Sequence, residues 1–169
     1  MKKVFALMML AISLLMSSAY AAEENTNKEE KQMHQEFITV FARGAKNDAY
    51  AKYFVGQSYL NMLSLEQVVI GNVTFEPGCR NNWHIHHADK GGGQILLVTG
   101  GRGYYQEWGK EAAEMKPGDC INIPVGVKHW HGAAPDSWFS HLAVECPGEN
   151  TSNEWLEAVT DEIYNHLEA

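Results

Sequence analysis

Short apolar runs with a period of two residues dominate the chain from residue 53 to residue 145. Side chains alternate between the two faces of a strand, so this period predicts β-strands with one buried face. Glycine and proline turns separate the runs, a pattern typical of an all-β sandwich or barrel. The strands are expected over residues 53–65, 67–75, 94–99, 103–108, 119–123, 128–133 and 138–145.

Apolar residues recur at helical spacing on both sides of this region. Residues 32–43 carry such positions from Met33 onward and predict a short amphipathic helix. Trp155, Val159 and Ile163 are four residues apart, which predicts a C-terminal amphipathic helix over residues 153–167. The expected fold class is therefore all-β, a barrel with short N- and C-terminal helices.

The first 21 residues have the composition of a secretory signal peptide. Lys2 and Lys3 precede an apolar stretch at residues 4–16, and residues 19–21 (AYA) supply a small-x-small cleavage site. The apolar stretch is shorter than the roughly 20 residues that span a bilayer. We expect cleavage before Ala22 and export to the periplasm or out of the cell.

The chain has 169 residues, of which 45% are hydrophobic, enough for one buried core but too few for two comfortable domains. We expect four segments. They are a signal peptide at residues 1–21, a disordered tether and short helix at 22–52, a barrel at 53–146 and a C-terminal helical segment at 147–169.

The formal charge of −8 would become −10 once Lys2 and Lys3 leave with the signal peptide. A dispersed negative charge favours solubility and disfavours nucleic acid or anionic lipid as a partner. Three cysteines, Cys79, Cys120 and Cys146, leave at least one thiol free or intermolecular, and their pairing stays open.

Five of the eight histidines fall in two clusters, at residues 84–87 and 129–131. Residues i and i+2 of a strand share a face, so His84 and His86 can point into one cavity, as can His129 and His131. Two imidazole pairs that meet inside a barrel predict a site for a divalent metal ion.

Glycine and proline residues at fixed distances frame these histidines. Residues 78–101 and 118–129 resemble the two motifs of the cupin superfamily, and the resemblance extends over residues 53–145. It implies a cupin jelly-roll barrel that commonly pairs with a second copy, so a homodimer is expected. The metal ligands that it implies are His84, His86, the residue at position 94 and His129.

Residues 75–86 (FEPGCRNNWHIH), 94–99 (QILLVT) and 128–143 (KHWHGAAPDSWFSHLA) are similar to small single-domain cupins that include bacterial manganese-dependent hydroxynitrile lyases. In that group the third ligand is glutamine, as Gln94 would be here. This resemblance implies cyanohydrin cleavage or formation and favours manganese, while iron, nickel and zinc accept the same ligands. A neutral ligand set leaves the metal charge uncompensated and favours a Lewis acid role.

The loop before Gln94 departs from the cupin pattern. Seven residues, from His87 to Gly93, separate His86 from Gln94, where the motif has a shorter spacing. Three consecutive glycines would let this loop bulge outward and leave Gln94 in place. Ligation by His87 or Asp89 is the alternative, although strand alternation turns His87 away from His86.

His131 and His141 are candidate general bases, because an imidazole has a pKa close to neutral and histidines line the pocket at these positions in the resembling lyases. A buried structural role is the alternative for each. Four aromatic residues are candidates for lining a small-molecule pocket, with packing in the core as the alternative. They are Trp83, Trp130, Trp138 and Phe139.

Three functions fit these features. The first is a metal-dependent lyase that acts on a small molecule. The second is an iron-dependent oxygenase or isomerase, because iron on three histidines can activate oxygen. The third is a binding module without catalysis, because a fold does not define a function.

Overall fold

The computed structural model describes residue 37 and residues 39–168. The predicted signal peptide and most of the predicted helix at residues 32–43 lie outside the described residues. Residues 39–43, the described end of that helix, adopt no helical structure, so the prediction is wrong for them. Within the described part of the chain, no helix has the length and apolar character needed to cross a membrane.

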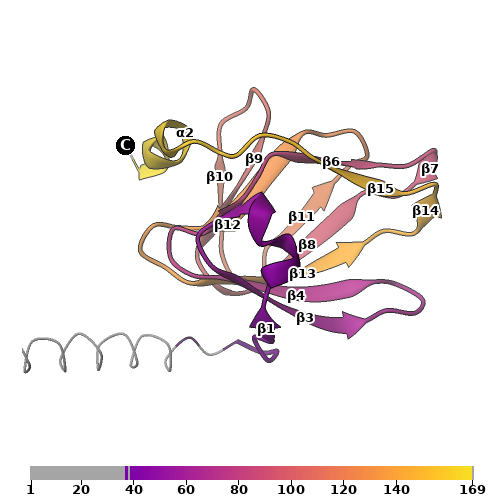
Figure 1. Cartoon of the computed structure of the whole chain (residues 1–169), viewed down its shortest axis with the longest axis horizontal. Coiled ribbons are helices and arrows are strands. Elements are labelled where there is room, and N and C mark those ends of the chain that lie inside the picture. Colours follow the sequence, from indigo (N-terminus) through magenta and orange to yellow (C-terminus); the bar gives the residue numbers. More distant parts are fainter. Residues whose placement is uncertain (1–36, 38, 169) are drawn as a thin grey trace, which may run out of the picture. The chain divides into compact units, whose positions relative to one another are not determined.

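The first of two large antiparallel sheets contains six strands in the order β1-β3-β4-β13-β8-β11 (Figure 1). The long central pairings of β13 with β4 and β8 hold this sheet together. Its strands are β1 (Ala45–Lys46), β3 (Ser58–Ser64), β4 (Ile70–Phe75), β8 (Gln94–Gly101), β11 (Cys120–Ile123) and β13 (Phe139–Glu145).

The second sheet has seven strands and completes the all-β jelly-roll barrel that the sequence predicts. Its path is β10-β9-β12-β5-β2, with β6 pairing both β12 and β15. The strands are β2 (Phe54–Val55), β5 (Arg80–Asn81), β6 (His84–His87), β9 (Gly103–Glu107), β10 (Ala113–Met115), β12 (His129–Ala133) and β15 (Ser152–Trp155).

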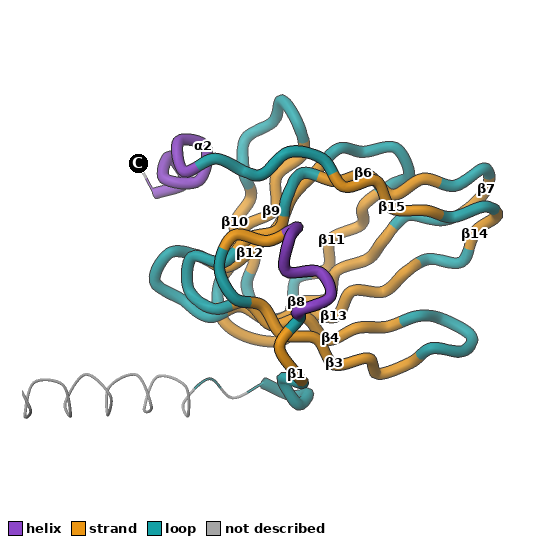
Figure 2. Tube along the Cα trace, viewed as in Figure 1, coloured by secondary structure: helices purple, strands orange, loops and turns teal. Residues whose placement is uncertain are grey.

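Helices are few and short among the described residues (Figure 2). A 3-10 helix, η1 (Asp48–Tyr53), lies between β1 and β2. The helix α2 (Asp161–Asn165) begins after Thr160, whose hydroxyl accepts a hydrogen bond from the Ile163 amide at 3.3 Å. A last 3-10 turn, η2, covers His166–Glu168.

The predicted helix over residues 153–167 is wrong for its first part. Residues 152–155 form β15, which pairs antiparallel with β6 so that Asn153 lies opposite His86 and Trp155 opposite His84. A spacing of four residues fits a strand of period two as well as a helix, and the open edge of β6 decides between them. The C-terminal residues thereby become part of the barrel.

The core has an inner and an outer part. The inner cluster lies between the sheets and includes Phe75, Leu96 and Phe139. An outer cluster on the other face of β12 packs Trp130 against Tyr164 from α2, which explains why all five residues of β12 are buried. Alternating residues of β12 can therefore face the cavity without exposing the opposite side of the strand.

Arg80 fastens the C-terminal segment to the barrel. Its Nε and Nη2 atoms donate hydrogen bonds to the Val159 carbonyl oxygen at 3.1 and 3.0 Å, and its guanidinium lies 4.3 Å from the centre of the Tyr164 ring. The Arg80 side chain is buried, and its Nη2 also lies 2.5 Å from Asp161 Oδ1, so the buried charge has a partner of opposite sign.

The long loop before Gln94 contains a short extra strand that pairs with a segment after β13. β7 (Lys90–Gly91) pairs with β14 (Gly148–Glu149), and the three glycines at 91–93 all have positive φ angles of 64°, 75° and 86°. Glycine adopts such angles without the steric cost of a side chain. β8 then starts at Gln94 and continues to Gly101, two residues beyond the predicted end at residue 99.

Candidate metal centre

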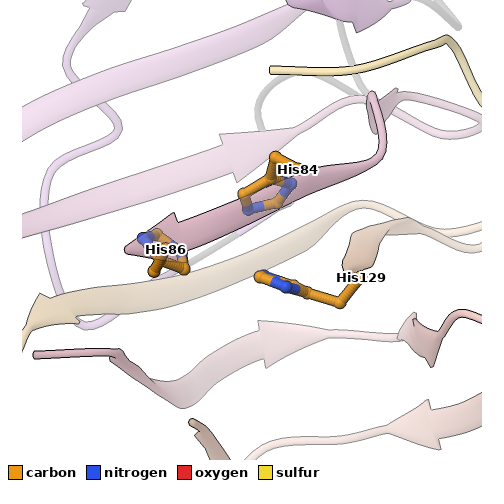
Figure 3. A group of neighbouring side chains, drawn as sticks. All are labelled: His84, His86 and His129. Carbon is orange, nitrogen blue, oxygen red and sulfur yellow. The ribbon is translucent and has the colours of Figure 1, made fainter. Parts of the chain in front are cut away.

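Three buried histidines meet at the junction of β6 and β12. His84 and His86 project from β6 on the same side, and His129 begins β12 directly opposite His84 (Figure 3). One ring nitrogen from each histidine lies within 4.8 Å of those of the other two. The burial pattern of β6 alternates, which places His84 and His86 inside as the period of the strand predicts.

Each of the three rings donates through Nδ1 to an oxygen atom. A hydrogen bond at Nδ1 places the ring proton there and leaves the lone pair on Nε2, the arrangement found in histidines that bind metals. The Nε2 atoms of His86 and His129 are buried and have no hydrogen-bond partner. The acceptors are Asn82 O at 3.0 Å for His84, Asn153 Oδ1 at 2.7 Å for His86 and Val127 O at 2.9 Å for His129.

Burial keeps the rings of His84 and His129 neutral. Loss of solvent lowers the pKa of His129 to about 4, and it lowers the pKa of His84 well below its usual value, assisted by the nearby His129. A neutral imidazole is the form that binds a metal ion, so His84 and His129 are in their ligand state at neutral pH. The three residues fit a divalent metal.

Gln94 stands at the start of β8 beside this cluster and lines the same cavity as His84 and His86. Its Nε2 donates to Glu145 Oε1 at 2.5 Å, while its Oε1 is buried without a partner. His87 points away, with its Nε2 2.8 Å from Glu154 Oε2 and its side chain 44% exposed. Gln94 therefore offers a side-chain atom without a partner beside the cluster, its Oε1, whereas His87 does not.

A cavity of about 410 Å³ opens beside the cluster. His84, His86, Gln94, His131 and His141 line it. Apolar and aromatic side chains form much of the remaining wall, which suits a small organic ligand. These wall residues include Tyr50, Phe54, Leu60, Met62, Val69, Val73, Ala143 and Trp155.

The structure brings both candidate general bases into this cavity. The rings of His131 and His141 lie 4.8 Å apart, nearly perpendicular, and both are buried. Asn81 Oδ1 accepts the His131 backbone amide at 2.9 Å, which turns Asn81 Nδ2 toward His131 Nε2 at 3.0 Å. Neither ring nitrogen of His141 makes a hydrogen bond of normal geometry.

None of the four predicted aromatic pocket residues lines this cavity, so that expectation is corrected. Trp83 precedes the inward-facing His84, and Trp130 lies between His129 and His131. Strand alternation therefore turns both tryptophans into the outer cluster. Trp138 packs near Tyr59 at 6.2 Å between ring centroids. Phe139 belongs to the inner core, where its ring lies 5.4 Å from that of His141.

Sequence reasoning missed four residues that hold the site. Asn81, Glu145, Asn153 and Trp155 contact or support the histidines and Gln94. Glu145 and His141 are four residues apart on one predicted strand and therefore share a face, which the sequence alone could have indicated. Asn153 and Trp155 could be found only after the pairing of β15 with β6 was known.

Comparisons with known proteins show the family of the chain. The family described as Cupin domain matches residues 71–143. An (R)-mandelonitrile lyase from Granulicella tundricola is 45% identical over 93 residues, which are 55% of this chain and 68% of that protein.

The fold is also found in solved structures. A cupin-like protein from Thermotoga maritima has a TM-score of 0.67 and 39% identity, covering 77% of this chain and 97% of its own. A DMSP lyase from Ruegeria pomeroyi has a TM-score of 0.50 and 14% identity over 74% of this chain and 64% of its own, a likeness of fold alone. The chain belongs to the cupin family.

Proposed function

We propose that the protein is a metal-dependent lyase that cleaves or forms cyanohydrins. One divalent ion, with manganese as first choice and iron, nickel or zinc as alternatives, would be held by His84, His86, His129 and Gln94. The observation that carries the proposal is a set of three buried atoms without hydrogen-bond partners, Nε2 of His86, Nε2 of His129 and Oε1 of Gln94, beside a cavity with a largely apolar lining. The (R)-mandelonitrile lyase of Granulicella tundricola supports the reaction class.

The bound metal supplies a Lewis acid that polarises a hydroxyl or carbonyl oxygen. The chain supplies the proton transfer, and His141 is the better placed of the two candidate bases. Burial lowers the pKa of His141 to about 4, partly opposed by the backbone of Leu142, so its ring is neutral. His131 is also neutral, but its Nε2 accepts from Asn81 and is occupied.

In the cleavage direction, His141 accepts the hydroxyl proton of the cyanohydrin as the carbon–carbon bond to the nitrile breaks. Cyanide leaves with the bonding electrons and takes the proton back, giving hydrogen cyanide and an aldehyde or ketone. The burial of His131 and His141 keeps water from competing for this proton. The apolar walls around Phe54, Leu60 and Val73 would receive the organic substituent.

Export and assembly are part of the proposal. Residues 1–21 support secretion to the periplasm or beyond, and the cupin habit of pairing through sheet edges supports a homodimer. Mass spectrometry of protein expressed from the full chain tests cleavage before Ala22. Light scattering tests the dimer.

The function is tested by measuring metal content and cyanohydrin cleavage on the same preparation. Protein purified without chelator is analysed for metal and then given (R)- and (S)-mandelonitrile and acetone cyanohydrin. We expect about one metal per chain and release of benzaldehyde, with both lost in His84→Ala and both kept in His87→Ala, the outward neighbour on β6.

Full metal occupancy without turnover of any cyanohydrin would reject the lyase. Oxygen consumption by the iron-loaded protein would then favour an oxygenase, and ligand binding without any turnover would favour a binding module.

A further inference from the structure

Glu145 faces two candidate ligands at once. It ends β13 directly opposite Gln94 in the register of β13 with β8. Its Oε1 accepts from Gln94 Nε2 at 2.5 Å, and its Oε2 lies 3.6 Å from His86 Nδ1. One carboxylate therefore contacts both a candidate glutamine ligand and a candidate histidine ligand.

The contact with Glu145 decides which end of the Gln94 amide turns inward. An amide carries a donor and an acceptor that are almost equal in size, so it needs a partner to fix its orientation. A carboxylate accepts hydrogen bonds and donates none, so Gln94 can present only its NH₂ group to Glu145. The amide oxygen is then left on the other side, where it is buried and has no partner.

The same carboxylate bears on the charge of the site. Three imidazoles and an amide bring no negative charge to a divalent ion, which raises the cost of removing the ion from water. A carboxylate hydrogen-bonded to a ligand polarises it and increases its strength as a donor to the metal. Glu145 is placed to act in this way through Gln94 and His86, with its side chain 36% exposed.

We propose that Glu145 is a positioning residue that aims the Gln94 oxygen at the metal and supplies, from behind the ligands, the negative charge that the ligands lack. This inference rests on the metal site of the proposed function but not on the reaction. Asn153 holds the Nδ1 atom of His86 at 2.7 Å, so the role of Glu145 is exerted first through Gln94.

The test is Mn²⁺ affinity, measured from the electron paramagnetic resonance signal of free Mn²⁺ during titration of the full-length mature protein. We expect Glu145→Gln to weaken binding about 10- to 100-fold, the range found when a group supporting a metal ligand is lost. The spectrum of the bound ion should also change. Glu154→Gln, which removes a carboxylate from the outward His87 contact, should bind as the wild type does.

A reciprocal exchange separates positioning from simple damage. The double variant Gln94→Glu with Glu145→Gln again places a carboxylate opposite an amide, with the two groups at exchanged positions. We expect it to bind Mn²⁺ at least 5-fold more tightly than Glu145→Gln alone. Circular dichroism of each variant checks that the barrel has folded.

Wild-type affinity and an unchanged bound-ion spectrum in folded Glu145→Gln would overturn the inference, as would a wild type that binds no Mn²⁺. Loss of cyanohydrin turnover is not a readout here. A wild-type protein that binds Mn²⁺ but cleaves no cyanohydrin would reject the proposed function and leave the role of Glu145 standing.

Discussion

Trp155 lies against the imidazole of His84, with the ring centroids 4.7 Å apart and an angle of 26° between the planes. Trp155 also stacks on Tyr53 at 4.6 Å and 9°. A residue of the last strand thus supports a candidate ligand on the sixth, and an aromatic series connects η1 with the histidine cluster.

Replacing Trp155 by alanine should destabilise the metal-free protein by about 2 kcal/mol, because it removes two stacked aromatic contacts and buried apolar area. Trp155→Phe should keep most of the stability, since a phenyl ring can still stack. Urea unfolding of the chelator-treated variants measures both. Equal losses in the two variants would show that ring stacking at this position does not matter.

Asn153→Ala should weaken Mn²⁺ binding about 10-fold or more, because His86 Nδ1 loses the oxygen that fixes its proton. Asn153→Asp keeps an acceptor at the same place and should bind close to the wild type. Titration with Mn²⁺ compares them. Asn122→Ala, an exposed asparagine on β11, is the control for a change of the same size elsewhere.

Adding Mn²⁺ at 100 times its dissociation constant should stabilise the wild-type fold by about 2.7 kcal/mol, because the ion binds the folded state alone. Thermal unfolding with and without chelator shows this as a shift of the melting temperature. The shift should disappear in His86→Ala and persist in His87→Ala. A shift that survives in His86→Ala would place the metal elsewhere.

The metal-free protein should lose stability as the pH falls below 6.5. His141 has its pKa lowered by burial to about 4, so between pH 6.5 and 4 the unfolded chain takes up a proton that the folded chain refuses. The contribution of this residue is complete above pH 6.5 and declines by up to about 1.4 kcal/mol per pH unit across that interval. Stability that declines with the same slope in His141→Asn would contradict the assignment.

The three free cysteines should differ in their reaction with a thiol reagent. Burial first, and the charge of Glu76 second, raise the pKa of Cys79 to about 12, so it has almost no thiolate at neutral pH. Cys120 is exposed and should react with Ellman's reagent in the native protein, whereas Cys79 should react only after unfolding. Fast labelling of Cys79 in a Cys120→Ser variant would refute this.

The strands and the histidine cluster could be predicted because both depend on local periodicity. On β6, His84 and His86 are buried, whereas Ile85 and His87 are only half-buried, which is the alternation that a strand period of two residues predicts. That the longer loop leaves Gln94 at the start of β8 could also be expected, because three glycines tolerate positive φ.

The residues that support the ligands could not be predicted in this way. Asn153 and Trp155 meet His86 and His84 only through the pairing of β15 with β6, a contact between distant parts of the chain. The prediction that four aromatic residues line the pocket was wrong for a related reason. Strand alternation puts Trp130 on the face of β12 that points away from the histidines. Only the packing of Tyr164 against it shows that this outer face is also buried.

The pairing of β15 with β6 also affects the order in which the protein is made. His86 and Asn153 are 67 residues apart, so at about 5–20 residues per second the ribosome completes β6 several seconds before β15 emerges. During that interval the nascent chain holds His84 without Trp155 and His86 without the oxygen that fixes its proton. A metal ion at this site would therefore be held tightly only by a chain that is complete through β15, and a truncated chain should retain little metal.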